Sequence, residues 1–247
     1  MHLSAVLFDV NNTLIDIETD EHMEEVYRAI SHFLTYQGIS LHRDQVSNLY
    51  FQVMKEQFQS NPEKFPEFDV VAVWREVLAR NAKDYTRSLP PQKLNELPRV
   101  LAEMQRGISR KRLLAFPQAD EVLRHLKNSY RLAIVSDAQS AYAVPELKAV
   151  ELDEYFEAII VSGDYGYRKP DARLFQTALD RLEVAPANAI FVGDDRYRDV
   201  FGAQQLGMKT VWFCHHTEGG HPKDAEPDYI VYQFCEVLRA VEFLAAR

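Results

Sequence analysis

The sequence predicts an α/β fold: a doubly wound parallel sheet that carries an inserted, all-helical second domain. Three observations support this prediction. From residue 116 onward, short runs rich in β-branched and aliphatic residues alternate with helical stretches. A block with helical periodicity fills residues 16–114, and one more strand-like run, AVLF, precedes that block. The helices therefore interrupt the α/β unit directly after its first strand.

The block of residues 16–114 is expected to hold about four helices with short connections. Its apolar residues recur every three or four positions, which places them on one face of a helix. The four groups are Met23, Val26, Tyr27, Ile30 and Leu34; Val46, Leu49, Tyr50, Val53 and Met54; Val70, Val73, Trp74, Val77 and Leu78; and Leu97, Leu101 and Met104. Gly38 is the expected end of the first helix, and the segments SNPEKFPEF and SLPPQ separate later ones.

Five further strands are predicted after Phe116, namely RLAIVS, EAIIVS, AIFVG, TVWFC and YIVY. Helical stretches near residues 119–128, 171–183, 199–206 and 233–246 separate these runs. Strands that are apolar throughout indicate a sheet covered by helices on both faces. We therefore expect two domains, an α/β core of residues 1–15 and 115–247 and a helical cap of residues 16–114.

Composition and charge restrict the partners. The chain has 28 basic and 37 acidic residues and a formal net charge of −9, which argues against general binding to nucleic acid or anionic membranes. No run approaches the roughly 18 apolar residues of a membrane span, and the chain enters its first strand without a basic and apolar leader. We expect a cytoplasmic protein that acts on a small molecule, in an oligomeric state that the sequence leaves open.

Polar side chains follow three of the predicted strands, at the edge where such sheets bind ligands. They are Asp9 after the first strand, Ser136 at the end of the second with Asp137 directly after it, and Asp194 and Asp195 after AIFVG. Asp199 follows shortly afterwards, and Lys169 lies just before a predicted helix. Carboxylate oxygens suit Mg²⁺, whereas a hydroxyl, an ammonium and helix N-terminal amides suit a phosphoryl group. The pattern therefore indicates a site for both.

Four motifs, in this order, resemble those of the haloacid dehalogenase-like (HAD) hydrolases, and the resemblance covers nearly the whole chain. The first family motif, Asp-x-Asp-x-Thr, is matched by Asp9 to Thr13 except at Asn11. The other three are matched by Ser136, by the segment Arg168 to Asp171 around Lys169, and by Gly193, Asp194, Asp195 and Asp199. The resemblance implies a Rossmann-like core with a type-one helical cap.

The resemblance also implies a role for each residue. Asp9 would be the nucleophile that attacks phosphorus and forms an aspartyl-phosphate. The substrate would be bound by Thr13, Ser136 and Asp137, and Lys169, oriented by Asp199, would balance its negative charge. The Mg²⁺ group would comprise Asp9, the backbone carbonyl of Asn11, Asp194, Asp195 and Asp199. The implied activity is hydrolysis of a small phosphorylated metabolite.

Three positions depart from the family pattern. Asn12 stands where glycine is common, and asparagine tolerates the positive φ of such a turn better than most residues. Asp137 stands where many relatives have asparagine, which adds a negative charge near the phosphate. Asn11 replaces the second aspartate, which in family phosphatases protonates the leaving oxygen and then activates water. An amide cannot exchange that proton, and general acid–base catalysis is worth roughly 10²–10⁴-fold.

Three functions therefore stay open on the sequence. The favoured one is a Mg²⁺-dependent phosphatase that is slow, or restricted to good leaving groups such as acyl or aryl phosphates. The second is a catalytically silent or binding protein that keeps the fold. The third is a non-phosphatase hydrolase such as a 2-haloacid dehalogenase; these usually have Tyr at the second position and an early cap arginine, whereas no arginine precedes Arg28 here.

Overall fold

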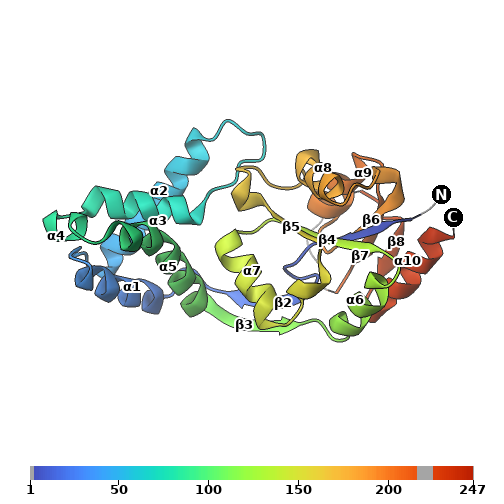
Figure 1. The fold of residues 1–247 in the computed structure, drawn as a ribbon, viewed down its shortest axis with the longest axis horizontal. Helices are drawn as coiled ribbons and strands as arrows, with labels where there is room; N and C mark the ends of the chain where they lie inside the picture. The colour runs from blue at the N-terminus through green and yellow to red at the C-terminus, as the bar shows by residue number, and fades with distance from the viewer. Residues whose placement is uncertain (1–2, 216–224, 247) are drawn as a thin grey trace.

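The computed structural model describes residues 3–215 and 225–246, which form two lobes joined by a short ribbon (Figure 1). One lobe contains a six-stranded parallel sheet with the order β5-β4-β1-β6-β7-β8. Its strands are β1 (Ala5–Phe8), β4 (Arg131–Ser136), β5 (Ala158–Val161), β6 (Ala189–Gly193), β7 (Lys209–Phe213) and β8 (Tyr229–Val231). This sheet confirms the predicted fold class and the six predicted strands.

Both faces of the sheet are covered because successive residues of a strand point to opposite faces. In β1, Val6 and Phe8 are buried in the same apolar cluster as α6 and α10, whereas Ala5 and Leu7 are buried with α8 and α9. These helices are α6 (Ala119–Lys127), α8 (Ala172–Arg181), α9 (Gly202–Gln204) and α10 (Val237–Ala245). Complete burial on both sides explains why the strand reads as an uninterrupted apolar run.

The strand order creates a crevice at the carboxyl edge of the sheet. The chain passes from β1 to β4 and β5 on one side and then returns to β6 on the other side of β1. The loops that follow β1 and β6 therefore diverge, and such switch points are where open α/β sheets bind ligands. Because Phe8 pairs with Ile134 and with Val192, Asp9 and Asp194 leave neighbouring strands at nearly the same level.

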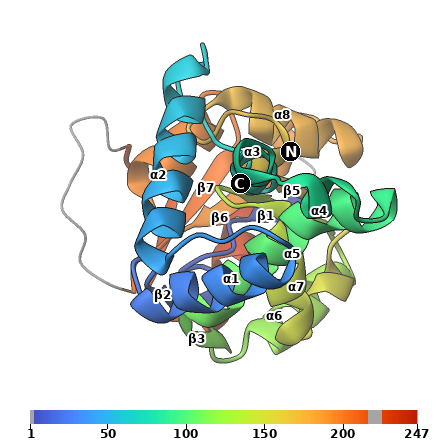
Figure 2. The same ribbon diagram turned by 90° about the vertical axis from the view of Figure 1, so that its left-hand side faces the viewer.

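The second lobe is helical and faces this edge of the sheet (Figure 2). Its helices are α1 (Glu24–Tyr36), α2 (Arg43–Ser60), α3 (Val70–Asn81), α4 (Asp84–Arg87) and α5 (Pro91–Ser109). They enclose their own apolar core, in which Trp74 stacks on Tyr50. Gly38, with a φ of 87°, follows the end of α1 as predicted. Among the helices of the described ranges, none has both the length and the apolar character needed to cross a bilayer.

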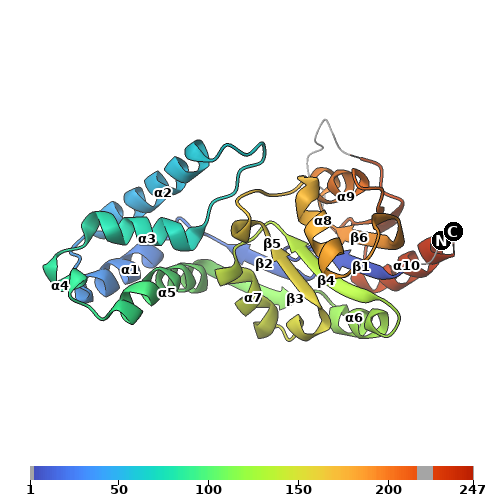
Figure 3. The ribbon, with the colours of Figure 1, turned by 45° about the horizontal axis from the view of Figure 1, so that its top comes forward.

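Two short antiparallel strands, β2 (Ile15–Thr19) and β3 (Arg110–Ala115), join the lobes (Figure 3). The sequence pattern does not predict this ribbon, because its residues are mostly half-exposed or exposed and the two strands lie far apart in the chain. The predicted boundaries between core and cap, after residues 15 and 114, fall within the ribbon. The division of the chain into these two domains stays a prediction.

Helix α7 (Ser140–Ala149) was also missed, because Pro145 lies inside it and an interior proline removes a helical hydrogen bond. The helix belongs to the sheet lobe but packs against α5. Tyr142 joins the apolar core of the helical lobe, and the Glu146 carboxylate accepts hydrogen bonds of 2.6 and 3.2 Å from the Arg106 guanidinium. This ion pair is largely buried, with 2% and 13% of the two side chains exposed, and it fastens one lobe to the other.

We predict that Arg106→Ala lowers the free energy of unfolding by about 3 kcal/mol, because it leaves the buried Glu146 carboxylate without its partner. Urea denaturation followed by circular dichroism measures the change. Arg99→Ala is the matched control, since Arg99 lies on the same helix and pairs with Glu103 at the exposed surface. Such a pair is worth less than about 1 kcal/mol, so equal losses in both variants would contradict the prediction.

Candidate active site

A pocket of about 220 Å³ opens at the carboxyl edge of the sheet. Its lining consists of Asp9, Asn11, Asn12, Asp137, Lys169, Asp194, Asp195, Arg198 and Asp199. Seven of these nine residues are predicted site residues, and the structure brings them together from the segments that follow four strands, β1, β4, β5 and β6. The sequence analysis did not predict Arg198 as a site residue. Within the described ranges, the helical lobe contributes none of the lining residues.

Lys169 lines the pocket and lies between two carboxylates. Its Nζ is 2.7 Å from Oδ1 of Asp9 and 2.6 Å from Oδ1 of Asp199, and only 3% of its side chain is exposed. Burial alone would lower the pKa of this ammonium, but the charges of Asp199 and Asp9 outweigh burial and raise the pKa above its ordinary value. Lys169 therefore stays protonated and supplies the positive charge that lets two carboxylates approach each other.

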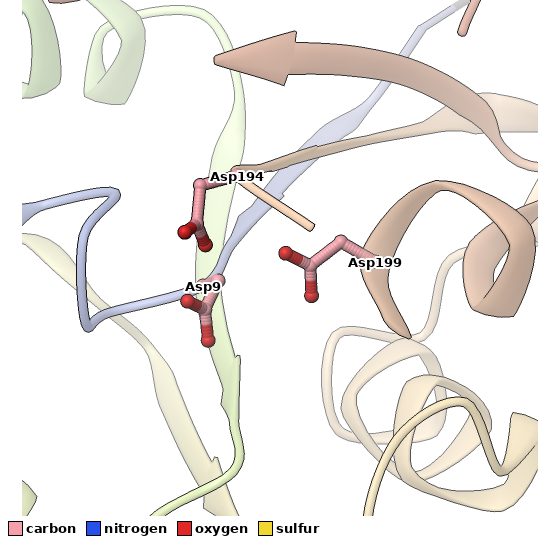
Figure 4. A group of neighbouring side chains, drawn as sticks. All are labelled: Asp9, Asp194 and Asp199. Carbon is pink, nitrogen blue, oxygen red and sulfur yellow. The ribbon is translucent and has the colours of Figure 1, made fainter. Parts of the chain in front are cut away.

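Asp9, Asp194 and Asp199 gather their carboxylates beside this lysine (Figure 4). One oxygen from each lies within 4.8 Å of the others. Burial, followed by the charges of Asp199 and Asp9, raises the pKa of Asp194 to about 8. Burial also raises the pKa of Asp199, although Lys169 opposes that rise. Buried carboxylates that repel one another, with oxygen as the donor atom, fit a hard divalent cation such as Mg²⁺.

The turn after β1 holds Asn11 and Thr13, two of the predicted site residues, with Asn12 between them. Asn12 has a φ of 60°, which confirms the expectation that asparagine takes a positive φ at this position. The Val10 carbonyl accepts hydrogen bonds from the backbone N–H groups of residues 13, 14 and 15 and so closes the turn. As a result Asn11 lines the pocket, and the Thr13 hydroxyl lies 3.5 Å from Oδ2 of Asp9 and 3.3 Å from Oδ1 of Asp194.

Ser136, the last residue of β4, and Asp137, which follows it, lie in different environments. The Ser136 hydroxyl is buried and has no hydrogen-bond partner within the part of the chain that the structure describes. A buried hydroxyl of this kind is unfavourable unless a ligand or water satisfies it. The Asp137 carboxylate accepts the backbone N–H of Lys169 at 2.8 Å through Oδ1, and its Oδ2 lies 3.8 Å from Arg198. Burial raises the pKa of the Asp137 carboxyl above its ordinary value, and the charge and backbone N–H of Lys169 oppose this rise.

Asp195 lines the pocket but lies outside the group of three carboxylates. Its Oδ1 accepts the backbone N–H groups of Tyr197 and Arg198, and its Oδ2 accepts the Arg198 Nε at 2.6 Å. Burial acts to raise the pKa of Asp195, but the charge of Arg198 holds it below its usual value. Asp195 thus caps the π-helical turn Arg196–Phe201, which begins before the helix expected near residues 199–206. Its part in a metal site stays a prediction.

In metal-free protein, we predict that the wild type loses stability relative to Asp194→Asn as the pH rises from 5 to 8. The raised pKa means that the folded state holds a proton on Asp194 that the unfolded state has released. This stabilisation is complete below the ordinary value of 3.8 and disappears as the pH passes the folded value near 8. The expected difference exceeds about 1 kcal/mol, the value of roughly one pKa unit.

Urea denaturation in the presence of EDTA at several pH values tests this dependence. Asp195→Asn is the control, because the lowered pKa of Asp195 gives the opposite sign. In that comparison the wild type gains stability relative to the variant as the pH rises through the acid range. Parallel stability curves for the wild type and Asp194→Asn would show that Asp194 titrates as an ordinary carboxyl.

Comparison with known proteins gives consistent matches. A family model described as haloacid dehalogenase-like hydrolase matches residues 6–213. The glyceraldehyde 3-phosphate phosphatase of Pyrococcus furiosus is 27% identical over 252 aligned positions, covering 97% of this chain and 93% of its own. The phosphoserine phosphatase of Thermus thermophilus is 32% identical over 182 positions, covering 71% and 70% of the two chains.

Solved structures share the fold. A 2-haloacid dehalogenase from Pseudomonas syringae pv. Tomato matches with a TM-score of 0.72 at 21% identity, covering 98% of this chain and 99% of its own. A HAD phosphatase from Thermococcus onnurineus matches with a TM-score of 0.58 at 24% identity, covering 97% and 98%. At these identities the structural similarity shows the fold alone, and the chemistry has to be inferred from the residues of the pocket.

Proposed function

We propose that this chain, which belongs to the haloacid dehalogenase-like hydrolases, is a phosphatase for a small phosphorylated metabolite. Membership of the family confirms the resemblance drawn from the four motifs, and with it the class of hydrolase. The phosphatase assignment is supported by relatives with phosphatase names at 27% and 32% identity. The observation that carries it is the buried Lys169 ammonium held between Asp9 and Asp199.

In the proposed reaction, a carboxylate oxygen of Asp9 attacks phosphorus and the bond between phosphorus and the ester oxygen breaks. The product of this step is an aspartyl-phosphate on Asp9, and the ester oxygen leaves with the bonding electron pair and takes its proton from solvent. Water then attacks the same phosphorus, releases inorganic phosphate and restores the carboxylate. Lys169 balances the charge on the phosphoryl oxygens, and the hydroxyls of Thr13 and Ser136 bind them. The buried, unsatisfied Ser136 hydroxyl supports this role.

We further propose that Asp9, Asp194 and the backbone carbonyl of Asn11 would hold Mg²⁺. When bound, the cation supplies positive charge that favours the phosphoryl group and the ionised form of the carboxylates. Asp199 contacts Lys169 through Oδ1 and accepts the backbone N–H of Asp195 through Oδ2. Asp199 is therefore better placed to position the lysine than to be a ligand.

Asn11 limits the proposed reaction. It lines the pocket where the family phosphatases carry their acid–base aspartate, and an amide neither protonates the leaving oxygen nor accepts a proton from water. The enzyme is therefore slow, or confined to esters whose leaving group needs little protonation.

We predict that beryllium trifluoride, which mimics a phosphorylated carboxylate, binds the protein in the presence of Mg²⁺ and requires Asp9. The expectation follows from the arrangement of Asp9, Thr13 and Lys169 around one position. Fluorine NMR of the wild type should show a bound signal that Asp9→Asn lacks. Binding that is unchanged in the variant would remove Asp9 as the nucleophile and favour a silent, ligand-binding cleft.

We predict that Asn11→Asp raises kcat/KM for an alkyl phosphate by about 10²-fold, near the low end of the range for general acid–base catalysis. The gain should be smaller on p-nitrophenyl phosphate, whose leaving group needs little protonation. Steady-state kinetics with both esters measures the difference. Asn12→Asp is the matched control, because Asn12 lines the same pocket and the substitution adds the same charge.

Several outcomes would overturn the proposal. Equal gains in the two variants would point to a general charge effect instead of proton transfer. No gain on any ester, in an Asn11→Asp protein that is folded and binds Mg²⁺, would exclude an impaired phosphatase. Release of chloride from 2-chloropropionate without Mg²⁺ would instead assign the chain to the dehalogenases.

A further inference from the structure

The pocket contains a second cation, Arg198, that the proposed reaction does not use. Its guanidinium is held in place by Asp195, whose Oδ2 accepts the Nε at 2.6 Å. One terminal nitrogen lies 3.8 Å from Oδ2 of Asp137, which is too long for a hydrogen bond. Among the described residues, the two terminal nitrogens of Arg198 therefore have no hydrogen-bond acceptor, although they lie in a pocket wall.

Burial separates the two cations of the pocket. The side chain of Lys169 is 3% exposed, whereas that of Arg198 is 45% exposed. Lys169 lies with the nucleophile in the buried floor, where the reacting phosphoryl group would sit. Arg198 therefore lies nearer the mouth, beside the part of a substrate that extends away from the phosphorus.

The charges of the pocket also single out Arg198. Five aspartates and only two cations line it within the described ranges. Lys169 already pairs with Asp9 and Asp199. An anionic group that enters the mouth of the pocket is therefore repelled by the carboxylates unless Arg198 binds it. A guanidinium suits this task, because its terminal nitrogens form paired hydrogen bonds with a carboxylate or phosphate.

We propose that Arg198 is a specificity-determining residue that binds a second anionic group on the organic part of the substrate. The pocket volume of about 220 Å³ accommodates the phosphoryl group together with a short organic part. The preferred substrates are then short phosphate esters with a carboxylate a few atoms from the ester oxygen. This inference rests on the proposed function for the position of the phosphoryl group.

Asp137 adjusts the strength of this contact. Its Oδ2 lies 3.8 Å from a terminal nitrogen of Arg198, so it competes with an incoming anion for the guanidinium. Its Oδ1 separately holds the backbone N–H of Lys169. Asp137→Asn keeps an oxygen for that hydrogen bond and removes the competing charge.

Binding of phosphonates tests the inference without requiring turnover. We predict that the wild type, in the presence of Mg²⁺, binds 3-phosphonopropionate about tenfold more tightly than propylphosphonate, which has the same chain without the carboxylate. One charge-assisted pair supports a factor of this size. Arg198→Gln should abolish the preference by weakening only the carboxylate-bearing ligand, and Arg198→Lys should keep part of it. Asp137→Asn should increase it. Titration calorimetry measures the four proteins.

Arg196→Gln is the matched control. Arg196 lies two residues away in the same turn, but it pairs with Glu226 and lies over Trp212, outside the pocket lining. This variant should bind both phosphonates as the wild type does. An equal loss of both ligands in Arg198→Gln, or an absence of any preference in the wild type, would overturn the inference. If the wild type prefers 3-phosphonopropionate but hydrolyses no phosphate ester, the proposed reaction is wrong and the role of Arg198 stands.

Discussion

The ammonium of Lys169, buried between Asp9 and Asp199, is the interaction on which the site depends. Two carboxylates that are buried side by side would otherwise repel each other and lose the hydration that stabilises their charge. The lysine offsets both penalties at distances of 2.7 and 2.6 Å. The sheet order makes this contact possible, because β1 and β6 are neighbours and each delivers one carboxylate beside the loop that carries Lys169.

The site around this lysine keeps its number of carboxylates although Asn11 and Asp137 both depart from the family pattern. Asn11 removes the carboxylate that would act as acid and base, whereas Asp137 adds one at a position where asparagine is usual. The two changes are not equivalent in chemistry, since Asp137 binds the Lys169 backbone and faces Arg198. The number of carboxylates in the pocket is therefore unchanged. One carboxylate is absent at position 11, where proton transfer would take place, and one is present at position 137, next to Arg198.

The sequence predicted the elements and residues that depend on nearby positions in the chain. It did not predict those whose structure depends on contacts with distant segments. Continuous apolar runs identified the six strands, and Asn12 showed its positive φ through its residue type alone. Helix α7 was missed because Pro145 argues against a helix, whereas packing of Tyr142 on the other lobe favours one. Arg198 was missed because its partners lie in two loops. The additional negative charge of Asp137 was the signal in the sequence that could have predicted a nearby cation such as Arg198.

The loop after β4 also connects the pocket to the helical lobe. Asp137 lines the pocket, and two residues later the Gln139 side chain accepts the backbone N–H of Val70 at 2.9 Å and donates to the carbonyl of Phe68 at 2.8 Å. The helical lobe contributes no side chain to the described pocket, yet it holds the segment that carries Asp137. The sheet lobe holds the same loop from the other side, because the backbone N–H of Ala138 donates to the Ser162 hydroxyl at 3.0 Å. Both lobes therefore fix the loop that places Asp137 beside the backbone of Lys169 and the guanidinium of Arg198.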